Sequence, residues 1–245
     1  MDWNIFFDIH KNLPRQGSGR DEYTQKAFEM IPQINNPRIL DIGCGPGLQT
    51  IKIAKLSKGR ITAIDIHQPY LDQLRKTAER EKLLDSIKIL NKSMFKMDFP
   101  EKYFDIIWAE GSIFIIGFER GLKEWKKYIK PKGYLAIHEM TWLKDDQPKE
   151  IKEFWEKVYP AISTIENNII IIKKLGYKLL GYFPLPEDAW WEFYYNPLEK
   201  RLKKLKIKYK NNIKALEMIK EEEKEIELYR KYNKWYGSVF YVMQK

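Results

Sequence analysis

The chain has 245 residues, 44% of them hydrophobic, and a formal net charge of +10. This length and composition suit one large α/β domain, and no apolar run reaches the roughly 18 residues that a membrane-spanning helix needs. The single cysteine excludes an internal disulfide, and the three scattered histidines predict no metal site. Residues 1–8 lack the pattern of a signal peptide, so we expect a cytoplasmic protein without a membrane partner.

The positive charge is concentrated between Lys200 and Lys214. A lysine-rich helix face exposed to solvent explains this run more simply than a nucleic-acid site, and we do not expect nucleic acid as a partner. An RNA substrate bound by this basic segment remains the first alternative.

The first two thirds of the chain alternate between strand and helix patterns. Two helices are predicted at 3–10 and 21–31, joined by a turn-rich hinge at 13–19. There follow strands at 38–42, 60–65, 87–91, 104–109 and 133–140, with helices at 47–57, 68–82 and 119–129. Residues 130–133 are predicted to form the turn before the last of these strands. Such alternation predicts a Rossmann-like, doubly wound, mostly parallel sheet.

The pattern loosens after residue 145. Helices are predicted at 148–158 and 161–175, and strands at 177–185 and 237–243. Between those strands lies an insertion, 187–235, that is first aromatic and then helical. We therefore predict a single domain over 1–245, with N-terminal helices or a lid at 1–32 and a helical cap at 187–235.

The cap carries an apolar stripe at helical spacing. Its residues are Leu198, Leu202, Leu205, Tyr209, Ile213, Leu216, Ile219, Ile226 and Tyr229. A break is expected near Asn211 and Asn212. Packing of the stripe onto the body of the protein is the simpler interpretation, and a homodimer face is the alternative.

A glycine-rich turn joins the strand at 38–42 to the helix after it. Asp41 is followed by glycines at 43, 45 and 47, a pattern that lets the backbone turn tightly and approach a ligand closely. The next strand ends at Asp65, about 20 residues after the glycines, where a carboxylate reaches the hydroxyls of a ribose. These two elements predict a nucleoside-type cofactor.

The spacing of the glycines separates two kinds of cofactor. A dinucleotide fingerprint would place a small residue where this chain has Leu48, because its third glycine comes one position earlier. The acid-x-Gly-x-Gly-x-Gly turn is similar to the first motif of class I S-adenosylmethionine-dependent methyltransferases. The resemblance extends over most of the chain, because that family has seven strands with the last one antiparallel. The segments 6–17 and 108–121 also resemble a group of small, uncharacterised prokaryotic methyltransferases, which indicates no substrate.

The resemblance implies S-adenosylmethionine as the cofactor and assigns a place to each residue of the crevice. Asp65 would bind the ribose, Ile66 and Met94 would lie beside the adenine, and Ser93 stands where an acid is common. The residues expected at the methionine end are Asp41, Gly43, Cys44 and Gly45. Glu110 would lie where the sulfonium meets the acceptor, and Gln16 belongs to a segment, 14–17, that would close over the cofactor.

The acceptor site is expected beyond the carboxyl ends of the strands. Glu110, His138, Glu139 and Trp142 lie there, and Glu110 and His138 are the candidate catalytic residues, with His10 as another possible base. The aromatic cluster 190–195 either forms a lid, surrounds a cationic amine or packs on the core.

Two absences favour a small-molecule acceptor. The chain has no Asn/Asp-Pro-Pro-Tyr/Phe motif after the fourth strand, and its only cysteine lies in the glycine turn. In-line methyl transfer then depends mainly on positioning the two partners. A second alternative is a non-catalytic cofactor-binding protein of the same fold.

Overall fold

The computed structural model describes residues 2–245, so Met1, the first residue of the predicted domain, lies outside the described residues. The α-helices are α1 Trp3–Ile9, α2 Asp21–Glu29, α3 Leu48–Ser57, α4 Gln68–Arg80, α5 Phe118–Trp125, α6 Lys149–Val158, α7 Ile165–Lys174, α8 Asn196–Lys208 and α9 Ile213–Tyr232. The strands are β1 Arg38–Ile42, β2 Arg60–Asp65, β3 Ile87–Asn91, β4 Phe104–Glu110, β5 Ile129–Trp142, β6 Ser163–Thr164, β7 Lys178–Pro184 and β8 Tyr236–Gln244. Among these residues, no helix is long and apolar enough to span a membrane.

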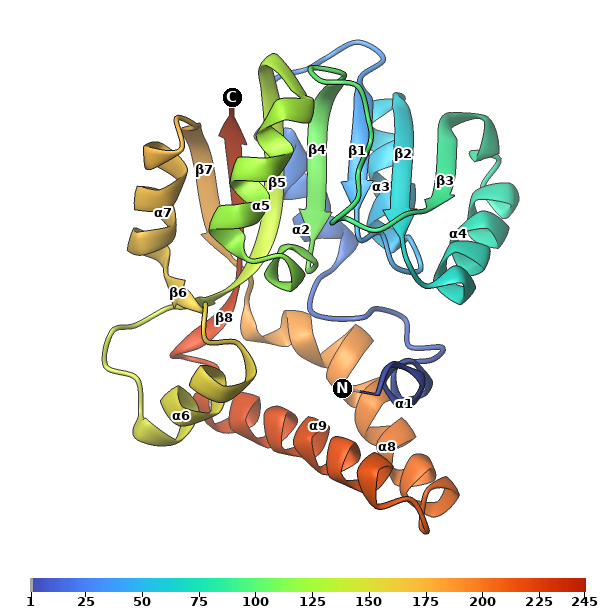
Figure 1. Ribbon diagram of the computed structural model, residues 1–245, viewed down its shortest axis with the longest axis vertical. Coiled ribbons are helices and arrows are strands. Elements are labelled where there is room, and N and C mark those ends of the chain that lie inside the picture. Colours follow the sequence, from blue (N-terminus) through green and yellow to red (C-terminus); the bar gives the residue numbers. More distant parts are fainter. Residues whose placement is uncertain (1) are drawn as a thin grey trace.

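The strands form one twisted sheet in the order β3-β2-β1-β4-β5-β8-β7 (Figure 1). The pairs among β1 to β5 are parallel, and β8 is antiparallel to both β5 and β7. The predicted seven-stranded Rossmann-like sheet with an antiparallel last strand is therefore confirmed. The structure adds only β6, a two-residue strand that pairs with the end of β5.

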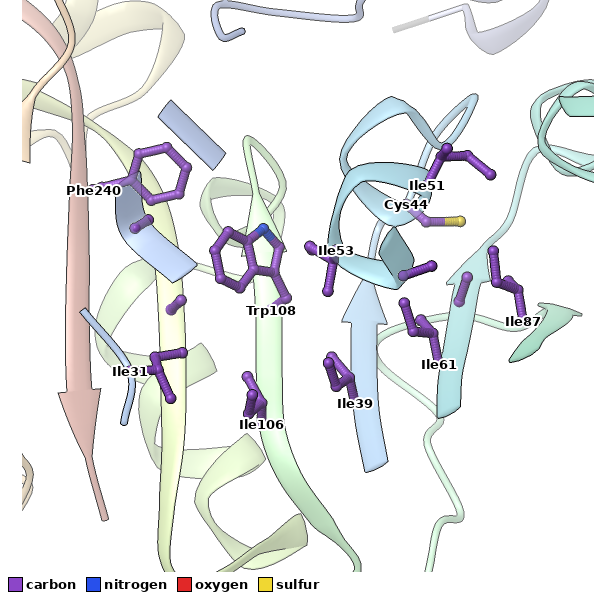
Figure 2. Packing of buried hydrophobic residues seen from close by; sticks show 14 of the residues in the cluster. Ile31, Ile39, Cys44, Ile51, Ile53, Ile61, Ile87, Ile106, Trp108 and Phe240 are labelled. Carbon is purple, nitrogen blue, oxygen red and sulfur yellow. The ribbon is translucent and has the colours of Figure 1, made fainter. Parts of the chain in front are cut away.

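Helices cover both faces of the sheet, as the near-continuous apolar strands require. On one face, α2, α3 and α4 pack over a core that includes Trp108 and Phe240 (Figure 2). On the other face, α5 and α7 cover a second core around Leu122 and Trp125. The carboxyl ends of the parallel strands point toward α1, α6, α8 and α9, which gather at one end of the sheet (Figure 1).

Two predicted boundaries are wrong for local reasons. The residues 130–133 lie inside β5, where Ile129 pairs with Phe104 and Tyr134 with Ile106, so the predicted turn is an irregular bulge in a strand that begins earlier. Lys132 adopts the left-handed φ of 61° that this bulge needs. The helix predicted from 161 begins only at Ile165, because Thr164 caps it and accepts a hydrogen bond from the Asn167 amide at 3.1 Å.

The cap helices share a third core with α1 and α6. Leu198, Leu202 and Leu205 of α8 are buried there together with Ile219 of α9. Of the predicted stripe, Ile213 and Leu216 lie outside this core. Ile213 has 77% of its surface exposed, because it begins α9 directly after the break at Asn212. Most of the stripe thus packs on the body of the protein, as the simpler interpretation predicted.

The buried stripe predicts unequal effects of two substitutions on α8. Leu202→Ala should lower the free energy of unfolding by about 2–5 kcal/mol, because it leaves a cavity in the third core. Ile207→Ala, at a position that is 75% exposed, should change it by less than about 0.5 kcal/mol. Urea unfolding measures both values, and equal small effects would mean that α8 does not pack as described.

Candidate functional site

The glycine turn is held to the end of β2 by main-chain hydrogen bonds. The amides of Gly43 and Cys44 both donate to the Ile64 carbonyl, at 2.9 and 3.0 Å. Gly43 and Gly47 have φ of 71° and 86°, which favour glycine. A Cβ at Gly43 would lie 2.5 Å from the Ser112 Cβ, and one at Gly47 would lie 2.2 Å from Leu74 Cδ1. Packing within the chain therefore requires these two glycines.

Gly45 differs from the other two glycines. Its φ is 52°, and a Cβ there would meet only Gln16, with the Cγ atom 3.9 Å away. Its amide donates to Oδ2 of Asp65 at 2.9 Å, while Oδ1 of the same carboxylate accepts from the His67 amide at 2.9 Å. Asp65 thus fixes the turn from the end of β2. The next residue, Ile66, is 57% exposed, which is unusual for an isoleucine after a buried strand.

Asp41 is fully buried, and only one of its two carboxylate oxygens accepts a hydrogen bond. Oδ2 accepts from the Thr50 hydroxyl at 2.5 Å, and Oδ1 has no hydrogen-bond partner among residues 2–245. Burial raises the pKa of this carboxyl to about 7. The Cys44 side chain, in contrast, points into the core beside Ile51 and Ile53 (Figure 2). The main chain of Cys44 therefore forms part of the glycine turn, whereas its thiol is buried in the core.

Ser93 and Met94 follow β3 on the same edge of the sheet. The Ser93 hydroxyl accepts from the Phe95 amide at 3.2 Å, so it is used within its own turn. Met94 reaches across to the glycine turn, with Cε 3.6 Å from the position of a Cβ on Gly43. The structure brings Met94, but not the Ser93 hydroxyl, to the turn.

Glu110, at the end of β4, is enclosed by donors. Its carboxylate accepts from Arg15 Nη1 at 3.0 Å, from the Thr24 hydroxyl at 2.9 Å and from Trp108 Nε1 at 3.2 Å. Both Glu110 and Arg15 are buried, with 3% and 7% of their side chains exposed. Burial raises the pKa of Glu110, and Arg15 opposes that shift. The carboxylate that was predicted to lie where the sulfonium meets the acceptor thus has both oxygens engaged by donors of the chain itself.

The segment 7–19 crosses above the glycine turn and joins α4 to the cap. The Phe7 ring stacks on His67 with centroids 3.6 Å apart, and Gln16 accepts from the Tyr70 hydroxyl at 2.5 Å. The Arg15 amide donates to the Phe193 carbonyl at 3.2 Å, and the Gly19 amide to the Ala189 carbonyl at 3.1 Å. The segment expected to close over the site is therefore docked on the residues 187–195.

A cavity of about 750 Å³ lies under this segment, between the carboxyl ends of the strands and the cap. Gln16 lines it and also lies next to Gly45, so the cavity adjoins the glycine turn. Its other lining residues include Phe6, His10, Gly111, Phe114, His138, Met140, Phe154, Trp155, Tyr159, Trp190, Tyr194, Glu222 and Glu225. Its size and its mostly apolar surface, to which seven aromatic side chains contribute, are typical of a small-molecule site. Eight charged residues also line it: Lys149, Glu150, Glu153, Lys157, Glu221, Glu222, Lys224 and Glu225.

His138 is the predicted catalytic residue that lines this cavity. Its Nε2 lies 3.4 Å from the Ser18 hydroxyl, and Nδ1 has no partner among the described residues. Burial lowers the pKa of His138 to about 3, so the imidazole is neutral and a weak base.

The other residues that were predicted around the acceptor do not all line the cavity. Glu139, the next residue on β5, does not line the cavity; burial raises the pKa of its carboxyl to about 8. Trp142 lies in the third core. His10 lines the cavity, with Nε2 3.3 Å from the Tyr194 hydroxyl.

Glu222 and Glu225 on α9 were not among the predicted site residues. They lie in a run of six charged residues, 220–225, which resembles a solvated face. The signal was their spacing from Ile219, Ile226 and Tyr229, at three or four residues, which puts them on the buried side of the helix.

Comparison with known proteins identifies the central part of the chain. Residues 39–133 match the family model described as a methyltransferase domain. A sterol 24-C-methyltransferase of Gibberella zeae is 26% identical over 153 residues, or 59% of this chain and 40% of that protein. The ubiquinone/menaquinone biosynthesis C-methyltransferase UbiE of Rickettsia massiliae is 27% identical over 71% of each chain. The chain thus spans about two fifths of the length of the sterol methyltransferase.

Among solved structures, a SAM-dependent methyltransferase from Thiobacillus denitrificans in complex with S-adenosyl-L-homocysteine superposes with a TM-score of 0.84. It is 17% identical, and the match covers 98% of this chain and 97% of that one. Residues 39–133 are therefore a methyltransferase domain, and the chain as a whole has the fold of the class I S-adenosylmethionine-dependent methyltransferases.

Proposed function

We propose that the protein transfers a methyl group from S-adenosylmethionine to a small molecule. The observation that carries this proposal is the cavity of about 750 Å³ beside the glycine turn, since Gln16 borders both. The match of residues 39–133 and the similarity to a structure bound to S-adenosyl-L-homocysteine support the cofactor.

The residues around the turn fit S-adenosylmethionine. The unpartnered Oδ1 of Asp41 can accept a hydrogen bond from the ammonium group of the methionine end. Gly45 leaves the space that a Cβ would fill. Asp65 can accept from the ribose hydroxyls, because each carboxylate oxygen keeps a free acceptor position. Ile66 and Met94 offer apolar surface to the adenine.

When bound, the cofactor supplies a methyl group that is already activated on a sulfonium. The chain's own residues then have to orient the acceptor and exclude water, which can contribute about 7–11 kcal/mol. The segment 7–19 and the cap cover one side of the cavity, and its edge near Lys157 and Glu221 is exposed to solvent. His138 can position the acceptor through Nδ1. Because its pKa is about 3, the site favours an acceptor that needs no strong base.

The basic run on α8 gives less support to an RNA substrate. Lys206 pairs with Glu223 at 2.7 Å, Lys208 with Asp8 at 2.6 Å and Lys214 with Asp2 at 3.3 Å. These pairs neutralise part of the positive face, whereas phosphate binding needs free cations. A small molecule in the cavity agrees better with this surface. A cytoplasmic location and a homodimer stay predictions from the sequence.

Methyl transfer is tested directly with methyl-tritiated S-adenosylmethionine and a metabolite extract, with mass spectrometry of the labelled product. Label in a small molecule is the expected result. Label in RNA alone would favour the first alternative. Binding of S-adenosylhomocysteine without transfer into any fraction would favour a non-catalytic protein.

Asp65→Ala should weaken the binding of S-adenosylmethionine at least about tenfold, because it removes charge-assisted hydrogen bonds to the ribose. Isothermal calorimetry measures this affinity. Asp72→Ala removes an exposed carboxylate on α4 and is the matched control, expected to bind as the wild type does. An unchanged affinity in Asp65→Ala would mean that the ribose lies elsewhere.

The affinity for S-adenosylmethionine should increase with pH up to about 7. The raised pKa of Asp41 means that this carboxyl is protonated below about 7, and the ligand's ammonium group favours the ionised form. Affinity should decline again near pH 8, where an α-amino group loses its proton. Calorimetry across this range tests the profile, and Asp41→Asn should bind weakly with no rise below pH 7. If the affinity of Asp41→Asn still increases with pH below 7, the titrating group is not Asp41.

Two substitutions distinguish how much each of the two carboxylates in contact with Arg15 contributes to stability. Glu110→Gln should destabilise the protein by about 3 kcal/mol, because it leaves a buried guanidinium without its buried partner. Asp21→Asn removes a partner that is 63% exposed and should cost at most about 1 kcal/mol. Urea unfolding gives both values, and trypsin should cut faster after Arg15 in Glu110→Gln. Equal effects of the two variants would contradict the role given to Glu110.

A further inference from the structure

One wall of the cavity carries two carboxylates that the proposed function does not use. Glu222 and Glu225 are three residues apart on α9, and both line the cavity. The proposed function needs a cavity for the acceptor but assigns nothing to this wall.

The neighbouring side chains leave these carboxylates largely unneutralised. The Tyr195 hydroxyl donates to Glu225 at 2.9 Å. His10 Nε2 lies 3.7 Å from Glu222. His10 Nδ1 donates to the Phe6 carbonyl at 3.0 Å, and burial lowers the His10 pKa, so the ring is neutral and Nε2 carries a lone pair. His10 therefore gives Glu222 neither a proton nor a positive charge.

The charge of this wall is negative. Within residues 2–245, no lysine or arginine nitrogen lies within 4.0 Å of either carboxylate. The tyrosines that face the pair, Tyr194, Tyr195 and Tyr236, are neutral. Glu221 also lines the cavity and pairs with Lys157 at 3.3 Å, and Lys149 and Lys224 line it as well. Five glutamates and three lysines line the cavity, so its charged side chains are net negative when the carboxyls are ionised. Burial raises the pKa of both Glu222 and Glu225, and a neighbouring carboxylate raises each further. A partly buried acidic pair without a cation in contact is unfavourable unless a ligand supplies one.

Independent observations show that the same cavity is built for a ligand. The ring nitrogens Trp190 Nε1 and His138 Nδ1 have no hydrogen-bond partner among the described residues. Both side chains are more than nine-tenths buried, and both line the cavity. Buried polar atoms are normally paired, so two orphans around one space indicate a missing occupant.

We propose that the acceptor is a mostly apolar molecule that carries a protonated amine, and that Glu222 and Glu225 bind this amine as an anchor. The aromatic walls contact the apolar body, and Trp190 and Tyr194 lie beside the pair, where ring faces also favour a cation. This inference rests on the proposed function, since it names the class of the acceptor.

The anchored nitrogen is distinct from the methyl-accepting atom. A protonated amine has no lone pair to attack a methyl group, so the accepting atom lies elsewhere on the molecule. Gly111 directly follows β4, and His138 pairs with Glu110, so this wall lies at the carboxyl end of β4. The next residue, Ser112, packs against Gly43 of the glycine turn. A metal ion fits the wall less well, because His10 Nε2 is engaged by Tyr194 and no metal-binding group of three His, Cys, Asp or Glu side chains occurs in the described chain.

The experiment compares n-decylamine, n-decanol and n-decanoate, which share an apolar chain and differ in charge. Calorimetry with the full chain, without cofactor, measures their affinities. We expect n-decylamine to bind at least about tenfold more tightly than n-decanol, and n-decanoate to bind most weakly. Equal affinities of the amine and the alcohol in the wild type, tighter binding of the carboxylate, or no binding of any of the three would overturn the proposal.

Variants then locate the preference. Glu222→Gln combined with Glu225→Gln should reduce the affinity for n-decylamine to that for n-decanol and leave n-decanol unchanged. Glu217→Gln, an exposed carboxylate on the same helix, is the control and should keep the wild-type preference. A preference that survives the double substitution would place the anchor elsewhere and overturn the assignment.

The binding of S-adenosylhomocysteine separates this inference from the proposed function. The double variant should bind it as the wild type does, because neither glutamate belongs to the glycine turn. A wild-type protein that binds S-adenosylhomocysteine but shows no preference for the amine refutes only the anchor. A protein that prefers the amine but fails to bind S-adenosylhomocysteine refutes the methyltransferase proposal instead.

Discussion

The buried ion pair between Glu110 and Arg15 connects the sheet to everything that covers its carboxyl end. Glu110 stands at the end of β4, and Arg15 comes from the segment that also bonds to the main chain at Phe193. A carboxylate removed from water needs this guanidinium, together with the Thr24 hydroxyl and the Trp108 ring nitrogen, to remain charged. Because Arg15 reaches Glu110 only when the segment is closed, the electrostatic need of one side chain holds the roof of the cavity in place.

The sheet could be predicted from the sequence because the patterns that specify its strands and turns are local. Near-continuous apolar runs, glycine turns and the strand–helix alternation each depend on a few neighbouring residues, and the antiparallel last strand followed from the family resemblance. The bulge at 130–133 was misread because a Pro and a Gly mark a turn equally well in a loop or in a strand. Ile213 was misplaced because periodicity does not reveal where a helix begins.

Less of the site could be predicted, because several of its contacts join residues that are far apart in the sequence. Asp41, Gly45, Asp65 and Met94 come together as expected, since the ends of adjacent parallel strands meet at one edge. The enclosure of Glu110 depends on Arg15, which is 95 positions away, and no local pattern indicates that pairing. Glu222 and Glu225 read as surface charges until the helices α1 and α9 are seen to lie together. Gly43 was assigned to the cofactor, but packing against Ser112 already requires it, as packing against Leu74 requires Gly47.

The position of the cap in the chain has a structural consequence for how such proteins diversify. The strands β7 and β8 pair directly, with Pro184 opposite Val239, and the Leu185 amide donates to the Ser238 carbonyl at 2.8 Å. The whole insertion 187–235 therefore leaves and re-enters the sheet at neighbouring points, as the loop of a hairpin does. Its length and chemistry can be replaced without altering the register of any strand. Evolution can thus remodel the cavity beneath the cap while the edge of the sheet that carries the glycine turn keeps its shape.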